Sequence, residues 1–68
     1  MMFPNLEAEQ ARRGQTNEYV AQALELSRQS YEAKKKNGNF KLKEILMLLK
    51  IYNATFDYLF SKKYESTS

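Results

Sequence analysis

Residues 16–36 read TNEYVAQALELSRQSYEAKKK, and they indicate the architecture of the whole chain. Thr16 and Ser27 are both good helix N-caps, and the short interval between them leaves room only for a short helix and a tight turn. We therefore predict one helix over residues 17–24 and a second from residue 28 to about 36; a turn of this length sets such helices at roughly 90–120° to each other. The first helix has apolar residues at the spacing of one buried face: Val20, Ala21 and Leu24.

Five further features place the remaining helices. Pro4 suits a first helical turn and Gly14 the position just past a helix end, which predicts a helix that closes with Arg12 and Arg13. The residues 37–39 form a turn, and a longer helix begins near Leu42. Its expected core face consists of Leu42, Ile45, Leu46, Leu49 and Tyr52, widened by Leu48. Asn53 can adopt the left-handed conformation after that helix, and Thr55 caps a last helix over residues 56–60.

These elements predict an all-α chain, a single compact domain of five helices over residues 1–65. Residues 66–68 are expected to form a frayed tail. The hydrophobic fraction is 43% and the charged fraction 28%, which are ordinary values for a globular domain. No apolar stretch approaches the roughly 18 residues that a membrane span needs, so we expect a cytoplasmic protein.

The composition argues against an enzyme and against a metal or cofactor site. The chain contains no cysteine and no histidine, so it lacks thiolate chemistry, the usual general base and the commonest metal ligand. The nearby carboxylates Glu7 and Glu9 lie on a solvated helix without a pocket that would shift their pKa. We expect a binding module without catalytic residues, cofactor or small-molecule substrate.

Positive charge is concentrated in the middle of the chain. Residues 28–43 contain six lysines or arginines and one glutamate, a net charge of +5, whereas the rest of the chain has a net charge of −2. A basic segment on a slightly acidic body is typical of proteins that bind the phosphate backbone of nucleic acids, although a solvated lysine-rich loop has the same composition.

Two stretches, TNEYVAQALELSRQSYEAKKKNG and FKLKEILMLLKIYNATFDYLF, resemble the phage repressor/Cro (lambda repressor-like) family of helix-turn-helix regulators. The resemblance covers about residues 5–60. It implies a five-helix domain that binds double-stranded DNA sequence-specifically, with the helix at about 28–36 in the major groove, in the cytoplasm of a bacterial host. It also implies a positive φ at Glu25, where the family usually has glycine, and an inward position for Lys34. We expect Lys34 to lay its methylenes on the core and keep its ammonium in water.

A helical wheel of residues 28–36 separates an inner arc from an outer arc with DNA-reading chemistry. Arginine can donate a bidentate pair to guanine and glutamine can do so to adenine, whereas alanine offers only an apolar contact to a thymine methyl. Glu32 either accepts a hydrogen bond from cytosine or holds Arg28 through an i,i+4 pair, and we favour the pair. The residues expected to face bases are Arg28, Gln29, Glu32 and Ala33.

Phosphate contacts are expected around the periphery of that helix. The family commonly contacts the DNA backbone at the N-terminus of the preceding helix and in the loop that follows the recognition helix. The expected phosphate-binding residues are Asn17, Lys35, Lys36, Asn37, Asn39, Lys41, Arg12 and Arg13.

The resemblance also implies a homodimer, because family members commonly pair through their C-terminal helices. The residues expected at that interface are Met47, Ile51, Phe56, Tyr58 and Phe60. The alternative function, from another class, is a protein-interaction module that uses the helix-turn-helix as a scaffold, with weak or no DNA binding.

Overall fold

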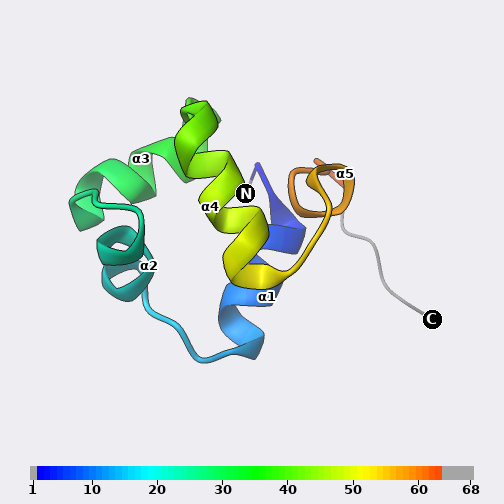
Figure 1. Cartoon of the computed structure of the whole chain (residues 1–68), viewed down its shortest axis with the longest axis horizontal. Helices are drawn as coiled ribbons and strands as arrows, with labels where there is room; N and C mark the ends of the chain where they lie inside the picture. The colour runs from blue at the N-terminus through cyan, green and yellow to red at the C-terminus, as the bar shows by residue number, and fades with distance from the viewer. Residues whose placement is uncertain (1, 64–68) are drawn as a thin grey trace.

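The chain folds into five helices, which a computed structural model describes over residues 2–63. They are α1 (Pro4–Arg12), α2 (Asn17–Ala23), α3 (Arg28–Asn37), α4 (Leu42–Tyr52) and α5 (Phe56–Leu59). Within residues 2–63 there is no strand, which confirms the all-α prediction. Figure 1 shows α4 in front of α1, with α2 and α3 to one side and α5 to the other.

Local side-chain chemistry starts the helices where the sequence predicts. The hydroxyls of Thr16, Ser27 and Thr55 each accept a hydrogen bond from a backbone N–H three residues later, at 3.1, 3.1 and 3.2 Å. Each bond satisfies a donor that the first turn of a helix leaves without an intrahelical partner. The three predicted N-caps are therefore confirmed.

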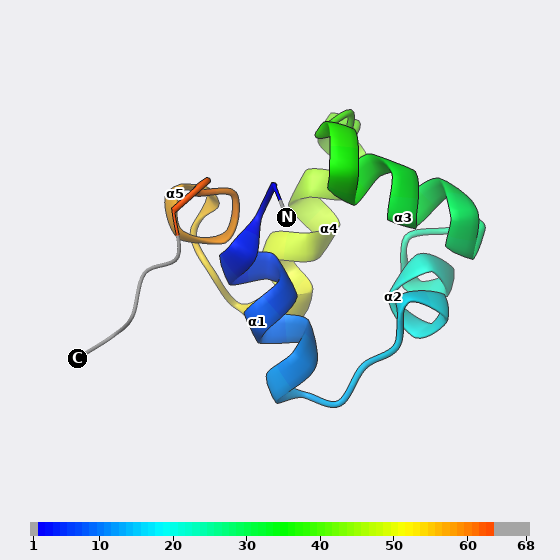
Figure 2. The same cartoon turned by 180° about the vertical axis from the view of Figure 1, so that it is seen from behind.

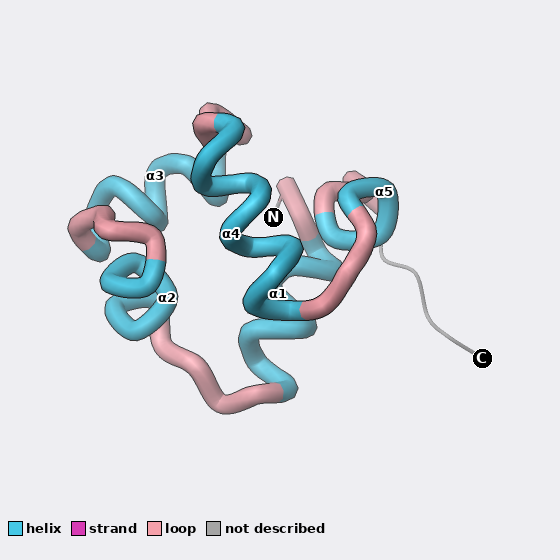
Figure 3. The backbone as a smooth tube through the Cα atoms, in the orientation of Figure 1, coloured by secondary structure: helices cyan, strands magenta, loops and turns pink. Residues whose placement is uncertain are grey.

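Helix ends are set by residues in the left-handed region of the backbone. Gly14, Glu25, Gly38 and Asn53 have φ values of 65°, 60°, 77° and 49°. After α1, α2 and α4, the residue with positive φ and the residue that follows it both donate backbone hydrogen bonds to carbonyls near the end of the helix, as in a Schellman motif. The loops between the helices are consequently short, as the tube in Figure 3 shows.

The core gathers one or two apolar residues from each helix. Six of them are almost completely shielded from solvent: Leu6, Val20, Ala21, Tyr31, Leu48 and Leu59. Phe3, Phe40 and Phe60 pack beside this core, with ring centroids 5.1 Å apart for Phe3–Phe60 and 5.8 Å apart for Phe40–Phe60. Phe40 and Phe60 therefore serve packing within the chain.

The two ends of the domain meet through Asn5 of α1. This side chain is fully buried, and its Nδ2 donates a hydrogen bond to the Tyr58 carbonyl in α5 at 2.8 Å. Figure 2, from behind, shows α1 in front and running beside α4, with α5 next to its first turn. Contacts between residues far apart in the sequence thus close the fold.

The predicted core face of α4 is correct in part. Leu48 and Tyr52 are buried and Ile45 and Leu49 are partly buried, as expected. Leu42 and Leu46 are 70% and 56% exposed, so their assignment to the core is wrong, and Glu44 is buried instead. The helix is apolar almost all round, so periodicity alone does not define its inward face. The buried carboxylate of Glu44 pairs with a lysine of α3, as described below.

Candidate nucleic-acid interface

The turn between α2 and α3 is fixed by backbone hydrogen bonds. The N–H of Leu26 donates to the Ala21 carbonyl at 2.8 Å, and that of Glu25 donates to the Gln22 carbonyl at 3.0 Å. Glu25 adopts the expected positive φ, 60°, at the position where glycine would be less strained. The chain then reverses at once into the Ser27 cap, so α2 and α3 pack against each other.

Tyr31 attaches α3 to the rest of the domain. It is completely buried, its ring lies 6.2 Å from that of Phe40, and its hydroxyl donates to Gln10 Oε1 at 2.8 Å. Burial, with smaller contributions from the charges of Tyr52 and Glu7, raises the pKa of Tyr31 far above its ordinary value. The hydroxyl therefore stays protonated and acts as a permanent donor.

The opposite side of α3 is exposed, as the helical wheel predicts. Arg28, Gln29, Ala33 and Lys36 all face solvent. Glu32 is half-buried, and its Oε2 lies 4.0 Å from Arg28 Nε and accepts a hydrogen bond from Asn17 Nδ2 at 3.0 Å. The favoured pairing of Glu32 with Arg28 is confirmed, and Asn17 holds the carboxylate from its other side.

Lys35 belongs to a polar network under α3 and not to the surface. Its ammonium lies 2.9 Å from Glu7 Oε1 and 2.7 Å from Asn17 Oδ1, and its side chain is 8% exposed. The expectation that Lys35 is a peripheral lysine, free to bind phosphate, is wrong. Residues 34–37 are all basic or amide residues, so the sequence does not show that Lys35 alone points toward the carboxylate of Glu7.

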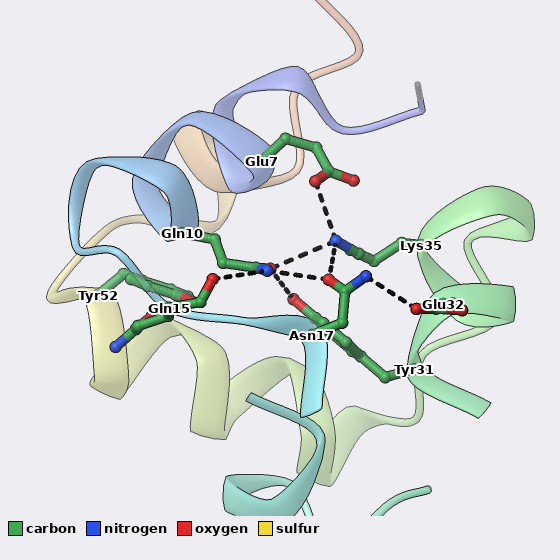
Figure 4. Close-up of polar contacts among 8 residues, drawn as sticks. All are labelled: Glu7, Gln10, Gln15, Asn17, Tyr31, Glu32, Lys35 and Tyr52. Atoms are coloured by element: carbon green, nitrogen blue, oxygen red, sulfur yellow. Dashed lines mark hydrogen bonds and ion pairs between the residues drawn. The ribbon is translucent and has the colours of Figure 1, made fainter. Parts of the chain in front are cut away.

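Asn17 and Gln10 connect the same network to α1 and α2, as Figure 4 shows. Gln10 Nε2 donates to Asn17 Oδ1 at 2.9 Å and to the Gln15 carbonyl at 3.1 Å, while its Oε1 accepts from Tyr31 and Lys35. The side-chain amide of Asn17 is thus bound within the protein. The phosphate contact expected at Asn17 stays a prediction for its backbone N–H. The role of Gln10 could not be predicted, because a single glutamine on a helix belongs to no recognisable sequence pattern.

Lys34 connects α3 to α4. Its Nζ lies 3.2 Å from the Glu44 carboxylate and donates to the Asn39 carbonyl at 3.0 Å, so the prediction of a solvated ammonium is wrong. Burial raises the pKa of Glu44, but hydrogen bonds from the Lys41 backbone N–H and from Lys34 outweigh it and lower the pKa overall. The buried carboxylate of α4 thus has a cationic partner on α3.

The two arginines at the end of α1 are bound by a carboxylate. Arg12 and Arg13 both donate to Glu9, which also accepts from the Tyr58 hydroxyl at 2.8 Å. Burial raises the pKa of Glu9, but the hydrogen bonds from Tyr58, Arg13 and Arg12 outweigh it and lower the pKa to about 2. Arg13 also lies over the Tyr52 ring, 5.0 Å from its centroid. The phosphate contacts expected of these arginines compete with this cluster.

The remaining phosphate candidates are exposed near the C-terminal end of α3. They are Lys36, Asn37, Asn39 and Lys41. The loop is ordered by the Asn39 N–H, which donates to Asn37 Oδ1 at 2.9 Å. These residues therefore present a compact polar and basic edge beside the outward side of α3.

An open hollow of about 400 Å³ lies between α1, α2 and α3. Its lining carries both signs of charge: Glu7, Asn17, Glu32, Lys35 and Lys36. Because two carboxylates and two lysines share the lining, and Lys35 pairs with Glu7, the hollow offers no concentrated charge of either sign. Among the described residues no group of three acidic side chains is placed to hold a metal ion.

The expected dimer residues have different environments. Met47 and Phe56 are exposed, at 38% and 53%, whereas Ile51, Tyr58 and Phe60 are partly buried and pack against the core. Phe56 stacks on Phe60 with ring centroids 5.2 Å apart. Of the five, Phe56 and Met47 are the residues most available to another molecule.

Comparison with known proteins finds no matching family model, no similar curated protein and no similar solved structure. Over residues 2–63, no helix combines the length and the apolar character that crossing a membrane requires.

Proposed function

We propose that this protein is a sequence-specific regulator that binds double-stranded DNA with α3 in the major groove. One observation supports the proposal above all. α3 is held on its inner side by contacts to α1, α2 and α4, while its outer side exposes side chains that match base edges. A rigidly held helix with free polar groups needs little reorganisation when it binds, which favours affinity and specificity.

The base contacts are assigned by chemistry. Arg28 donates its two parallel N–H groups to guanine O6 and N7, and Gln29 pairs with adenine N6 and N7. Ala33, one turn later, packs against a thymine methyl. Glu32, bound by Asn17 and Arg28, orients the guanidinium and does not read cytosine itself.

Phosphate contacts come from the basic edge at the end of α3. Lys36 and Lys41 carry the charge, and Asn37 and Asn39 add neutral donors. Such contacts fix the register of the protein on the duplex and make its affinity fall with salt. Lys35 has no part in them, because its ammonium neutralises Glu7.

The fold proposed for this function is the lambda repressor-like domain, acting as a homodimer with Phe56 at the interface. Two copies related by a two-fold axis would set their α3 helices in major grooves one turn, about 34–36 Å, apart. Occupying an operator in this way excludes polymerase and so represses transcription.

A second candidate function, protein binding with weak or no DNA contact, is favoured by one observation. The most exposed leucines of the described chain, Leu42 and Leu46, lie on α4 and not on the DNA-reading helix. A surface of this kind is typical of protein–protein contacts.

Selection from a random duplex pool at near-physiological salt tests the proposal directly. The expected product is a palindrome whose half-sites are about 10 base pairs apart, and the Arg28→Ala protein should lose preference at one position in each half-site. Retention of duplexes without enrichment would show phosphate binding alone. If no duplex is retained even at low salt, the proposal is wrong and the protein-binding function takes precedence.

A further inference from the structure

The outward side of α4 carries an apolar stripe that the fold leaves uncovered. Leu42 and Leu46 are one helical turn apart and are 70% and 56% exposed, and Met47 adjoins them at 38%. The opposite side of the helix packs into the core through Leu48 and Tyr52. Leucines exposed at i,i+4 are typical of a helix face that packs against another helix.

Positive charge lies on the same side of α4, between the two leucines and Met47. Lys43 and Lys50, two turns apart, point to the same side of α4 at about 100° per residue, and both are exposed. The one acidic residue of α4, Glu44, is buried against Lys34. The outward side of α4 is therefore apolar and basic, with Glu25 as the carboxylate that reaches Lys43, at 3.3 Å.

A small hollow of about 100 Å³ lies at the edge of the stripe, between the end of α2 and α4. Its apolar lining comes from Ala23, Leu24 and Met47, and its rim from Glu25, Lys43 and Glu44. A hollow of this kind can receive one apolar side chain of a bound helix, which gives the surface an anchoring point as well as a stripe.

We propose that this surface binds an acidic amphipathic helix of another protein. The surface, called the α4 face below, consists of Leu42, Lys43, Leu46, Met47 and Lys50. The partner helix lays leucines or similar residues along Leu42 and Leu46, inserts one beside Met47, and places carboxylates opposite Lys43 and Lys50. Charge complementarity selects this partner, because every exposed charge on the outward side of α4 is a lysine.

Two other occupants fit the α4 face less well. In an antiparallel pair of copies centred on Leu46 and Met47, Lys43 of one copy would meet Lys50 of the other, and the repulsion opposes pairing. A nucleic acid would satisfy the lysines, but its phosphates offer no apolar surface to Leu42 and Leu46.

The α4 face is independent of the proposed DNA contact. It contains none of the residues assigned to bases or phosphates. Figure 1 shows α4 in front, and Figure 2 shows α1 in front from the opposite direction, so α1 leaves one side of α4 uncovered. A negative result for DNA binding would therefore not refute binding at the α4 face, and the reverse also holds.

Binding of a synthetic peptide to the full chain tests the inference by fluorescence anisotropy. The probe is a helix of about 20 residues, long enough to be helical, with leucines at i, i+4 and i+7 flanked by glutamates. A peptide with the same leucines and lysines in place of the glutamates is the matched control. We expect saturable binding of the acidic peptide and no binding of the basic one.

Variants of the α4 face locate the binding. Leu46→Ala should weaken binding about tenfold, while Leu46→Met, which preserves apolar area, should keep it. The double change Lys43→Glu and Lys50→Glu should weaken binding at low salt by about tenfold, with Lys62→Glu as a charge control elsewhere on the surface. Circular dichroism of each variant checks that the helices are retained, which is expected because all four positions are exposed.

Three results would overturn the inference. The first is an acidic peptide that does not bind saturably, or that binds the Leu46→Ala protein as well as the unaltered one. The second is a loss of duplex DNA affinity on Leu46→Ala, which would assign the face to nucleic acid. The third is conversion of a dimer to a monomer by Leu46→Ala in analytical ultracentrifugation, which would assign it to a second copy.

Discussion

The two sides of α3 use similar residues for opposite purposes. On the inner side, Lys34 and Lys35 are bound to carboxylates of α4 and α1, and Tyr31 is buried between α1 and the aromatic residues. On the outer side, Arg28 and Lys36 remain exposed. Three consecutive lysines, 34, 35 and 36, thus have three different environments, and position on the helix determines whether a charge stabilises the fold or meets a ligand.

This division separates two measurable quantities. Changes on the inner side should lower the free energy of unfolding, and they should lower DNA affinity only through that loss. Changes on the outer side should lower DNA affinity and leave the free energy of unfolding unaltered. The following predictions test the division, beginning with the largest effect.

Tyr31→Ala should have the largest effect, a loss of about 3–5 kcal/mol in the free energy of unfolding, because it removes the ring that anchors α3 and leaves a cavity. Urea denaturation followed by circular dichroism measures it. Tyr31→Phe keeps the ring and removes only the hydrogen bond to Gln10, so its cost should be about 1–2 kcal/mol. Equal losses for the two variants would contradict the role assigned to the ring.

Lys35→Met should cost about 2–3 kcal/mol of unfolding free energy, because Glu7, Gln10 and Asn17 lose a shared donor. A complete break of a buried pair costs more, but the Glu7 side chain is 29% exposed and water can solvate its charge. Lys36→Met, at the next position, is the matched control and should change stability by less than about 0.5 kcal/mol. If the two lysines were equivalent, the polar network would carry no stability.

Arg28→Ala should reduce affinity for the selected operator by about 1–3 kcal/mol and relax preference at one base pair, with an unchanged melting temperature. Gln22→Ala, at an exposed position on α2, is the control and should alter neither quantity. Operator titrations by electrophoretic mobility shift measure the change. Unaltered affinity and preference in the Arg28 variant would mean that α3 is not the reading helix.

Glu25→Gly should raise the free energy of unfolding by about 1 kcal/mol, because glycine adopts the positive φ of this turn without steric strain. The Lys43–Glu25 contact that it removes is exposed at both ends and adds little. Asn53→Gly, at the other positive-φ residue, should gain less, since asparagine tolerates the left-handed region. Thermal melts compare the two, and a larger gain at Asn53 would refute the strain argument.

Lys36→Ala should have the smallest effect on affinity at physiological salt, and it should act equally on all DNA sequences. The measurement is the slope of the logarithm of the binding constant against the logarithm of the salt concentration, which should become shallower by about one. An unchanged slope would mean that Lys36 contacts no phosphate, and the basic edge would then be reduced to Lys41.

The elements of the fold could be predicted because their boundaries depend on neighbours in sequence. Thr16, Ser27 and Thr55 cap helices through bonds to residues three positions away, and Gly14 and Asn53 end them through backbone conformation. The helix bounds accordingly differ from the predicted ones by at most two residues, and the exposed positions of Arg28, Gln29 and Ala33 follow from helical geometry.

The partners of polar side chains could not be predicted in the same way. Lys34 pairs with Glu44 and Lys35 with Glu7, ten and 28 positions away. The resemblance implies an inward position for Lys34 but not its partner, and nothing in the local pattern distinguishes Lys35 from Lys36. The same limit explains the two misplaced leucines of α4, because eight apolar residues and one glutamate of that helix compete for its inward positions. Whether a charged pair is buried depends on tertiary contacts and not on the local sequence.

The hydrogen bond from Asn5 to the Tyr58 carbonyl also has a consequence for the order of folding. The two residues are 53 positions apart, so a long stretch of chain must be closed into a loop before this contact forms. The turn between α2 and α3, in contrast, depends on hydrogen bonds between residues three to five positions apart. We therefore expect α1 and α5 to dock onto each other late in folding, after the turn between α2 and α3 has formed.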